Sequence, residues 1–191
     1  IKCPDTPGDH DWAIDFPRLM ARAKAQEVKK HGVPLADKLL GNPDLVGKIG
    51  TATAPLANWG NENPLNRKLM ESALGIHKDK KLPAFAATTF AKQFAAQRKA
   101  PQGEPAAKIA FFSTCYVNYN QPEIGTATLA VMAHNNVDVE LAYERCCGMP
   151  QWHNGDMDGA IEAAKFNVAY LLPFVDAGRI VIATNPTCSQ M

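Results

Sequence analysis

The chain has 191 residues, of which 46% are apolar and 20% are charged, so it is long enough for a sizeable core and too apolar for a disordered protein. Its net charge of +1 conceals a basic middle, because residues 17–103 hold 15 Lys or Arg against 6 Asp or Glu, whereas residues 104–191 hold 4 against 9. No apolar run approaches the roughly 20 residues that span a bilayer, and we expect no secretory signal.

The first hundred residues predict helices. Residues 1–16 are acidic and turn-rich, and apolar residues then recur at helical intervals among lysines and arginines, which predicts a basic helix over residues 17–30. Short helical pieces broken by Gly and Pro follow, one of them over residues 65–74, and residues 75–107 predict a basic, Ala-rich connector. We therefore expect residues 17–106 to form a basic, helical and loop-rich linker region.

The second half alternates strand and helix patterns. The sequence predicts strands over residues 108–112, 137–143 and 179–183 and helices over residues 121–134 and 158–176. Pro173 is expected to kink or shorten the end of the second helix. Because the order β-α-β-α-β with crossovers of this length specifies a parallel sheet covered by helices, we expect residues 107–191 to form an α/β domain with a three-stranded parallel sheet.

Four of the five cysteines follow the predicted strands. Cys115 follows the first strand, Cys146 and Cys147 follow the second, and Cys188 follows the third. Because parallel strands all end at one edge of a sheet, where open α/β sheets bind their ligands, we expect the four thiols to meet there. The odd cysteine count and the adjacent pair argue against a secreted disulfide scaffold and favour a reducing, intracellular compartment.

Four thiols at one edge indicate metal binding, since thiolates repel one another unless a cation neutralises them. Zinc takes four Cys, but its structural sites usually present two C-x2-C pairs, whereas iron–sulfur clusters tolerate wider spacing and an adjacent pair suits a larger inorganic core. Gly148 allows a positive φ directly after the pair, and helix starts near residues 121 and 157 would direct N–H groups towards an anionic cluster. Simple core packing and a dithiol redox pair are the alternatives.

The motif Cys146-Cys147-Gly148-Met149-Pro150, with Cys115 upstream and Pro186-Thr187-Cys188-Ser189 downstream, resembles the cysteine-rich CCG domain. That domain occurs in the B subunit of heterodisulfide reductase, in the C subunit of anaerobic glycerol-3-phosphate dehydrogenase, and in iron–sulfur subunits of lactate and glycolate oxidation systems. The resemblance covers about residues 107–191 and implies that Cys115, Cys146, Cys147 and Cys188 ligate a [4Fe–4S] cluster, which is non-cubane in the heterodisulfide reductase branch. Many members end the motif C-x-x-C, whereas this chain reads Cys188-Ser-Gln-Met191 and lacks a fifth thiolate.

The front of the chain extends the resemblance. Cys3-Pro4 looks like the end of the ferredoxin motif C-x2-C-x2-C-x3-C-P that precedes the CCG domain in these proteins. Cys3 would then ligate a separate ferredoxin-type cluster whose other ligands are missing from this chain, and residues 1–16 would end a ferredoxin-like segment. Because the chain starts without Met, we expect it to be part of a longer polypeptide.

The resemblance implies an iron–sulfur electron-transfer subunit of an oxidoreductase, which passes electrons to a quinone, a disulfide or a partner flavoprotein. No residue is a convincing proton-transfer catalyst, so we expect a non-catalytic or cluster-catalytic subunit. Its partners would be other oxidoreductase subunits, flavoprotein or ferredoxin-like, in the cytoplasm or on the inner face of the membrane, where the helix over residues 17–30 would rest. We expect no nucleic-acid partner, because the basic residues lack an aromatic platform. A structural zinc-binding interaction module is the alternative.

Overall fold

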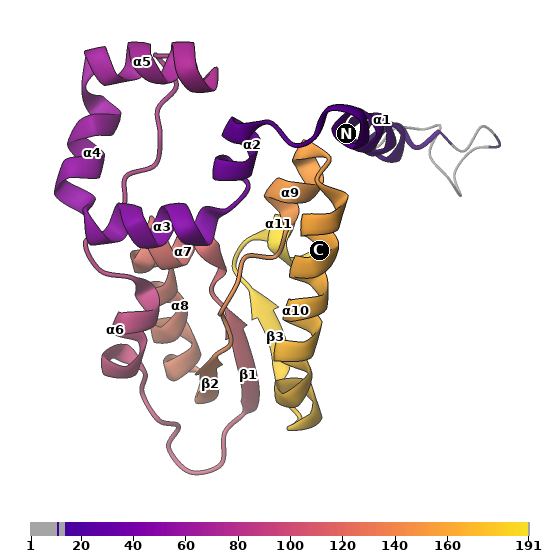
Figure 1. Ribbon diagram of the computed structural model, residues 1–191. Coiled ribbons are helices and arrows are strands. Elements are labelled where there is room, and N and C mark those ends of the chain that lie inside the picture. Colours follow the sequence, from indigo (N-terminus) through magenta and orange to yellow (C-terminus); the bar gives the residue numbers. More distant parts are fainter. Residues whose placement is uncertain (1–10, 12–13, 191) are drawn as a thin grey trace.

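The computed structural model describes residue 11 and residues 14–190, and the first half of this part of the chain forms helices (Figure 1). These helices are α1 (Phe16–His31), α2 (Leu35–Leu40), α3 (Pro43–Ala52), α4 (Ala54–Glu62), α5 (Pro64–Leu74) and α6 (Phe90–Gln97). The helices predicted over residues 17–30 and 65–74 are confirmed as α1 and α5. Cys3 and the ferredoxin-like segment expected around it lie outside the described residues.

Prolines and asparagines set where the short helices begin. α3, α4 and α5 each carry Pro in the first turn, where its missing N–H leaves no bond unmade. Asn42 and Asn63 cap α3 and α5 by accepting hydrogen bonds from the backbone N–H groups of Leu45 and Leu65. α5 ends at Gly75, whose φ of 68° suits a residue without a side chain. The breaks predicted at Gly41-Asn42-Pro43, Pro55 and Pro64 fall at helix boundaries, whereas those predicted at Gly50 and Gly60 are wrong, because these residues lie inside α3 and α4.

The expected connector over residues 75–107 contains one helix that the sequence did not predict. α6 begins after Thr89, whose hydroxyl accepts a hydrogen bond from the N–H of Lys92. Phe90 is fully buried and packs edge-on against Phe111, with ring centroids 5.7 Å apart. A helix of eight residues is marginal alone, so its contact with the core of the second half stabilises it.

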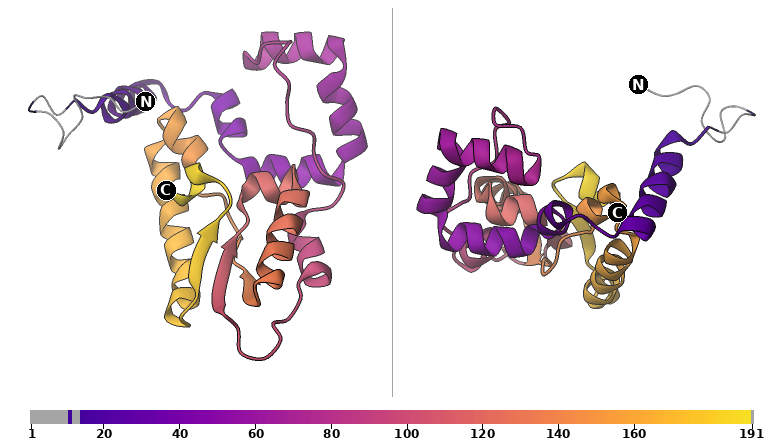
Figure 2. Two further views of the ribbon diagram at one scale, coloured as in Figure 1. Left: turned by 180° about the vertical axis from the view of Figure 1, so that it is seen from behind. Right: turned by 45° about the horizontal axis from the view of Figure 1, so that its top comes forward.

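The second half forms the predicted three-stranded parallel sheet. Its elements are β1 (Ala107–Phe112), α7 (Thr114–Tyr119), α8 (Pro122–His134), β2 (Val137–Leu141), α9 (Met149–Asn154), α10 (Met157–Asp176), β3 (Ile180–Ala183) and α11 (Pro186–Ser189). β1 lies in the centre, with Ile109 paired to Val139 of β2 on one side and to Ile180 of β3 on the other. Figure 2 shows α8 and α10 on opposite faces of this sheet. The chain thus runs from β1 to one neighbour and then crosses to the other, which creates a switch point where such sheets bind ligands.

Each face of the sheet has its own packing. Successive residues of a strand point to opposite faces, so Phe111 joins the core under α8 while Phe112 faces α10. The first core consists of Phe90, Ile109, Phe111, Val117, Leu129, Val137 and Val139. The second cluster lies at the carboxyl ends of the strands and contains Phe112, Tyr119, Tyr143, Cys146 and Cys147. Two of the predicted site residues are therefore part of the packed interior.

α10 runs through Pro173 without being shortened by it. The helix continues to Asp176, because the carbonyl of Pro173 still accepts a hydrogen bond from the N–H of Ala177. The expected shortening of this helix is therefore wrong. Nowhere in residue 11 or residues 14–190 is there a helix with both the length and the apolar character needed to cross a membrane.

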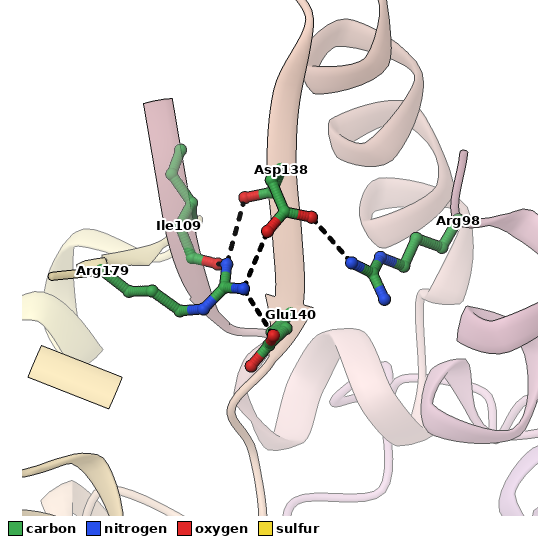
Figure 3. Close-up of polar contacts among 5 residues, drawn as sticks. All are labelled: Arg98, Ile109, Asp138, Glu140 and Arg179. Carbon is green, nitrogen blue, oxygen red and sulfur yellow. Dashed lines mark hydrogen bonds and ion pairs between the residues drawn. The ribbon is translucent and has the colours of Figure 1, made fainter. Parts of the chain in front are cut away.

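Arg179 joins the strands at the end of the sheet opposite the cysteines, and Figure 3 shows its polar contacts. It precedes β3 and reaches across β1, where its guanidinium donates to the carbonyl of Ile109 at 3.4 Å and to the carboxylate of Asp138 at 2.7 Å. It also pairs with Glu140 on β2, and Arg98 donates to the other oxygen of Asp138 at 2.7 Å. Asp138 is the centre of this network, and its side chain is only 13% exposed.

Replacing Asp138 with Asn is expected to destabilise the protein by about 1–3 kcal/mol at neutral pH, because two charge-assisted hydrogen bonds are weakened. Burial alone would raise the pKa of Asp138, but the hydrogen bonds and charges of Arg98 and Arg179 outweigh it and lower that pKa. A lowered pKa stabilises the fold above the unfolded-state pKa of about 4, and this contribution is lost as the pH falls through the folded-state value. Urea unfolding should therefore show that the difference in free energy of unfolding between wild type and variant becomes smaller below about pH 4. A difference in free energy of unfolding that stays constant with pH would contradict a stabilising role of the ionised Asp138.

Candidate functional site

The four predicted thiols lie together at the carboxyl ends of the strands. Cys115 is in the first turn of α7, Cys146 and Cys147 lie between β2 and α9, and Cys188 is in α11. The sulfurs form two close pairs, with Cys115 Sγ 3.8 Å from Cys146 Sγ and Cys147 Sγ 3.6 Å from Cys188 Sγ. The structure therefore brings together all four residues that the strand pattern had placed at this edge.

Two residues with positive φ, next to the cysteines, set the positions of the sulfurs. Thr114, directly before Cys115, has a φ of 72°, which is rare for a β-branched residue and is held in place by full burial of its side chain. Gly148, directly after the doublet, has a φ of 95°, which confirms the positive φ predicted there. A Cβ on Gly148 would lie 2.9 Å from the Cβ of Ala163 and 3.3 Å from the carbonyl oxygen of Ala160. α10 thus packs directly on the turn that presents the doublet.

Short helices begin at each of these turns, and the sequence predicted none of them. α7, α9 and α11 contain only four to six residues, which is too few to show a helical period. After the thiol hydrogen bonds, the backbone N–H of Tyr116 in α7 helps to lower the pKa of Cys115, and the N–H groups of Met149 in α9 and of Cys147 itself help to lower that of Cys147. This anion-stabilising role was expected instead from the helix starts near residues 121 and 157.

Each sulfur pair combines one acidic and one weakly acidic thiol. The hydrogen bonds that Cys147 shares with Cys146 and Cys188 lower its pKa to about 3, and the hydrogen bond with Cys146 lowers the pKa of Cys115. The same thiol contacts, together with burial, raise the pKa values of Cys146 and Cys188. A bound cation would displace the thiol protons of both pairs.

The pair distances fit thiolate ligands. Two thiolates on one tetrahedral metal with bonds of about 2.3 Å lie about 3.8 Å apart, close to both observed separations. Among the residues that the structure describes, no group of three or more His, Cys, Asp or Glu side chains is arranged around one ion. Two pairs of thiols suit a core with more than one metal atom, and four Cys are the usual ligand set of iron–sulfur clusters.

Two residues that sequence reasoning missed hold the peptide of Cys146. Asp44 of α3 accepts a hydrogen bond from the Cys146 N–H at 2.7 Å, and Asn167 of α10 donates to the Cys146 carbonyl at 3.0 Å. Asn167 had a sequence signal, since it is a polar residue on the side of α10 that carries Ala163 and Leu171. Asp44 had none, because an acidic residue in a first helical turn is ordinary capping.

An apolar cavity of about 470 Å³ opens beside Cys147 and Cys188, between α10 and β3. Its walls include Phe112, Val168, Leu171, Val175 and Val181. This volume lies within the range of small-molecule sites. An apolar molecule in this cavity would lie next to one of the two sulfur pairs.

Comparison with known proteins gives a family and relatives for this arrangement. Residues 109–191 match the family model of the cysteine-rich domain, CCG. The sequence is 33% identical to the C subunit of anaerobic glycerol-3-phosphate dehydrogenase from Escherichia coli strain K12 over 171 residues. The alignment covers 88% of this chain and 42% of that relative. No solved structure matches the chain.

Two further relatives share shorter segments. The sequence is 29% identical to lactate utilization protein A from Bacillus pumilus over 85 residues, which are 44% of this chain and 34% of that relative. It is 34% identical to the B subunit of fumarate reductase (CoM/CoB) from Methanothermobacter marburgensis over 55 residues, which are 28% of this chain and 11% of that relative. The chain spans about two fifths of the length of the Escherichia coli relative, and the resemblance to the CCG domain is confirmed.

Proposed function

Residues 109–191 are a cysteine-rich domain of the CCG family, and on that premise we propose that this chain is part of an iron–sulfur electron-transfer subunit of an oxidoreductase. The observation that carries the proposal is the pairing of four thiols at the ligand-binding edge of the sheet. The relatives point the same way, since their names place them in anaerobic glycerol-3-phosphate dehydrogenase and in fumarate reductase.

In this proposal Cys115, Cys146, Cys147 and Cys188 hold one iron–sulfur cluster, and Cys3 belongs to a separate ferredoxin-type cluster. The cluster would supply one-electron transfer when bound. The chain's own part is to keep four sulfurs on turns fixed by α7, α9 and α11 and to orient the doublet through Gly148. The comparisons give no support to zinc, which would also use these thiols.

The apolar cavity beside Cys147 and Cys188 favours an apolar electron acceptor. A quinone ring is apolar on its faces and suits walls such as Phe112 and Leu171. A disulfide substrate or a partner flavoprotein would instead reach the sulfurs from outside the cavity. We therefore propose a quinone as acceptor, in an assembly with other oxidoreductase subunits.

The test is metal analysis of the full-length protein purified without oxygen. Iron and acid-labile sulfide in amounts matching the proposed cluster, with an EPR signal on reduction, are the expected result. One zinc per chain, with neither visible absorbance nor redox activity, would favour the interaction-module alternative. Absence of both iron and sulfide would end the electron-transfer proposal.

α1 supports a peripheral membrane location on the cytoplasmic side. In the described part of the chain it has no buried residue, and it exposes Phe16 and Leu19 together with the basic residues of its last turn. Helices that combine exposed apolar and basic residues rest on anionic membrane surfaces.

Replacing Lys29 and Lys30 with Glu is expected to lower membrane association of the native assembly by at least about tenfold, since each basic residue near an anionic surface contributes about 1 kcal/mol. Fractionation of membranes from cells that express the full-length protein measures the effect. The matched control is the same charge reversal at Lys80 and Lys81, which lie between α5 and α6. Equal fractionation of both variants and wild type would exclude α1 as the contact.

A further inference from the structure

The carboxylate of Asp44 links the helical first half of the chain to the cysteine doublet. Asp44 lies in the first turn of α3, 102 residues before Cys146, and its Oδ2 accepts a hydrogen bond from the Cys146 N–H at 2.7 Å. Its Oδ1 accepts a hydrogen bond from the hydroxyl of Tyr143. Both donors belong to the segment between β2 and α9. One side chain therefore fixes two points of the loop that carries the doublet.

α3 is itself held close to the sheet, so Asp44 has little freedom to move. Gly47, one turn after Asp44, packs on the ring of Tyr119, and a Cβ there would lie 2.3 Å from the ring carbon Cγ. Asn42 caps the start of the helix through its bond to the Leu45 N–H. The close approach of α3 to α7 requires a residue without a side chain at position 47. The position of Asp44 is therefore set by backbone packing on both sides of it.

The charge of Asp44 reaches the thiols and the phenols around them. It acts with burial to raise the pKa of Tyr119 to about 12 and that of Tyr143 above its usual value. The Asp44 carboxylate lies 2.7 Å from the Cys146 nitrogen, so its negative charge disfavours further negative charge on the neighbouring sulfurs or on a group bound to them.

We propose that Asp44 is a positioning residue of the cysteine site, which holds the doublet peptide in place and lowers the reduction potential of the cluster bound there. The effect on the reduction potential rests on the proposed function of the four thiols. The positioning of the doublet peptide concerns this chain alone and holds with or without a cluster. Reduction adds an electron to the site, so removing the nearby carboxylate charge favours the reduced state.

Three variants of the full-length protein separate the two roles. Asp44→Asn keeps an oxygen that accepts from the Cys146 N–H and an amide that donates to the Tyr143 hydroxyl, but it removes the charge. Asp44→Ala removes both bonds and the charge. Asp37→Asn makes the same charge change in the first turn of α2 and serves as the matched control.

Redox titration of the EPR signal and iron analysis are the first measurements. For Asp44→Asn we expect near wild-type iron and an upward shift of the midpoint potential, and for Asp44→Ala a several-fold loss of iron. Asp37→Asn should change neither quantity. An unchanged potential in Asp44→Asn would overturn the electrostatic role.

Alkylation of the metal-free protein is the second measurement, and it needs no cluster. Iodoacetamide should modify Cys146 and Cys147 several-fold faster in Asp44→Ala than in wild type, with Asp44→Asn close to wild type. Equal alkylation rates in all three proteins, with circular dichroism showing that each is folded, would overturn the positioning role. If the wild-type protein holds no iron, the proposed function fails, and these alkylation rates still decide whether Asp44 holds the doublet.

Discussion

Replacing Cys147 with Ser in the full-length protein is expected to remove at least about nine tenths of the iron and acid-labile sulfide of the CCG cluster. The hydrogen bonds that Cys147 shares with Cys146 and Cys188 lower its pKa to about 3. A thiol with this pKa is a thiolate at neutral pH, which is the form that binds a metal. A serine hydroxyl stays protonated at neutral pH and binds iron poorly. Iron analysis and EPR under anaerobic conditions measure the loss.

Ser189→Ala is the matched control for this variant. Ser189 is next to Cys188 in α11, is exposed, and donates its hydroxyl hydrogen to the carbonyl of Pro186. Its replacement disturbs α11, which carries the partner sulfur of Cys147, without removing a sulfur, so the iron content should stay at the wild-type level. Full iron retention in Cys147→Ser, or an equal loss in both variants, would show that Cys147 is not a ligand.

The cysteine cluster was predictable in outline because it follows from topology. The apolar runs of β1, β2 and β3 and the lengths of the crossovers indicated a parallel sheet, and parallel strands end at one edge. Cys115, the doublet and Cys188 each follow a strand, so their convergence needed no knowledge of side-chain contacts. The ligand role of these residues stays a prediction, whereas their placement at one edge is what the structure shows.

The pairing of the sulfurs and the role of Asp44 were not predictable. Whether Cys146 approaches Cys115 or Cys188 depends on the turns at Thr114 and Gly148, and a φ of 72° at a threonine has no sequence signal. Asp44 contacts the doublet across 102 residues, through a helix placed by tertiary packing. α6 was missed for the same reason, since the burial of Phe90 stabilises it. Long-range packing decides these features, and local patterns do not record it.

Replacing Gly148 with Val is expected to destabilise the domain by about 2–4 kcal/mol and to displace the doublet. A φ of 95° costs a β-branched residue about 1–3 kcal/mol in strain. The added Cβ would also lie 2.9 Å from the Cβ of Ala163 and 3.3 Å from the backbone oxygen of Ala160. Because α10 spans twenty residues packed on β1 and β3, the turn must move instead of the helix, and Cys146 and Cys147 move with it. Thermal unfolding and iron content of the same sample measure the two consequences.

Gly103→Val separates backbone strain from the contact with α10. Gly103 has a φ of 71°, and no atom lies within 4 Å of a Cβ built on it. A valine there would therefore have a strained backbone but no steric clash with a neighbouring residue. We expect Gly103→Val to lose stability through strain alone, about 1–3 kcal/mol, and to keep its full iron content. Gly148→Val should lose more stability and also lose iron in the fraction that stays folded. If the two variants behave alike, the close packing of α10 on the doublet turn does not position the sulfurs, and strain at Gly148 is the whole effect.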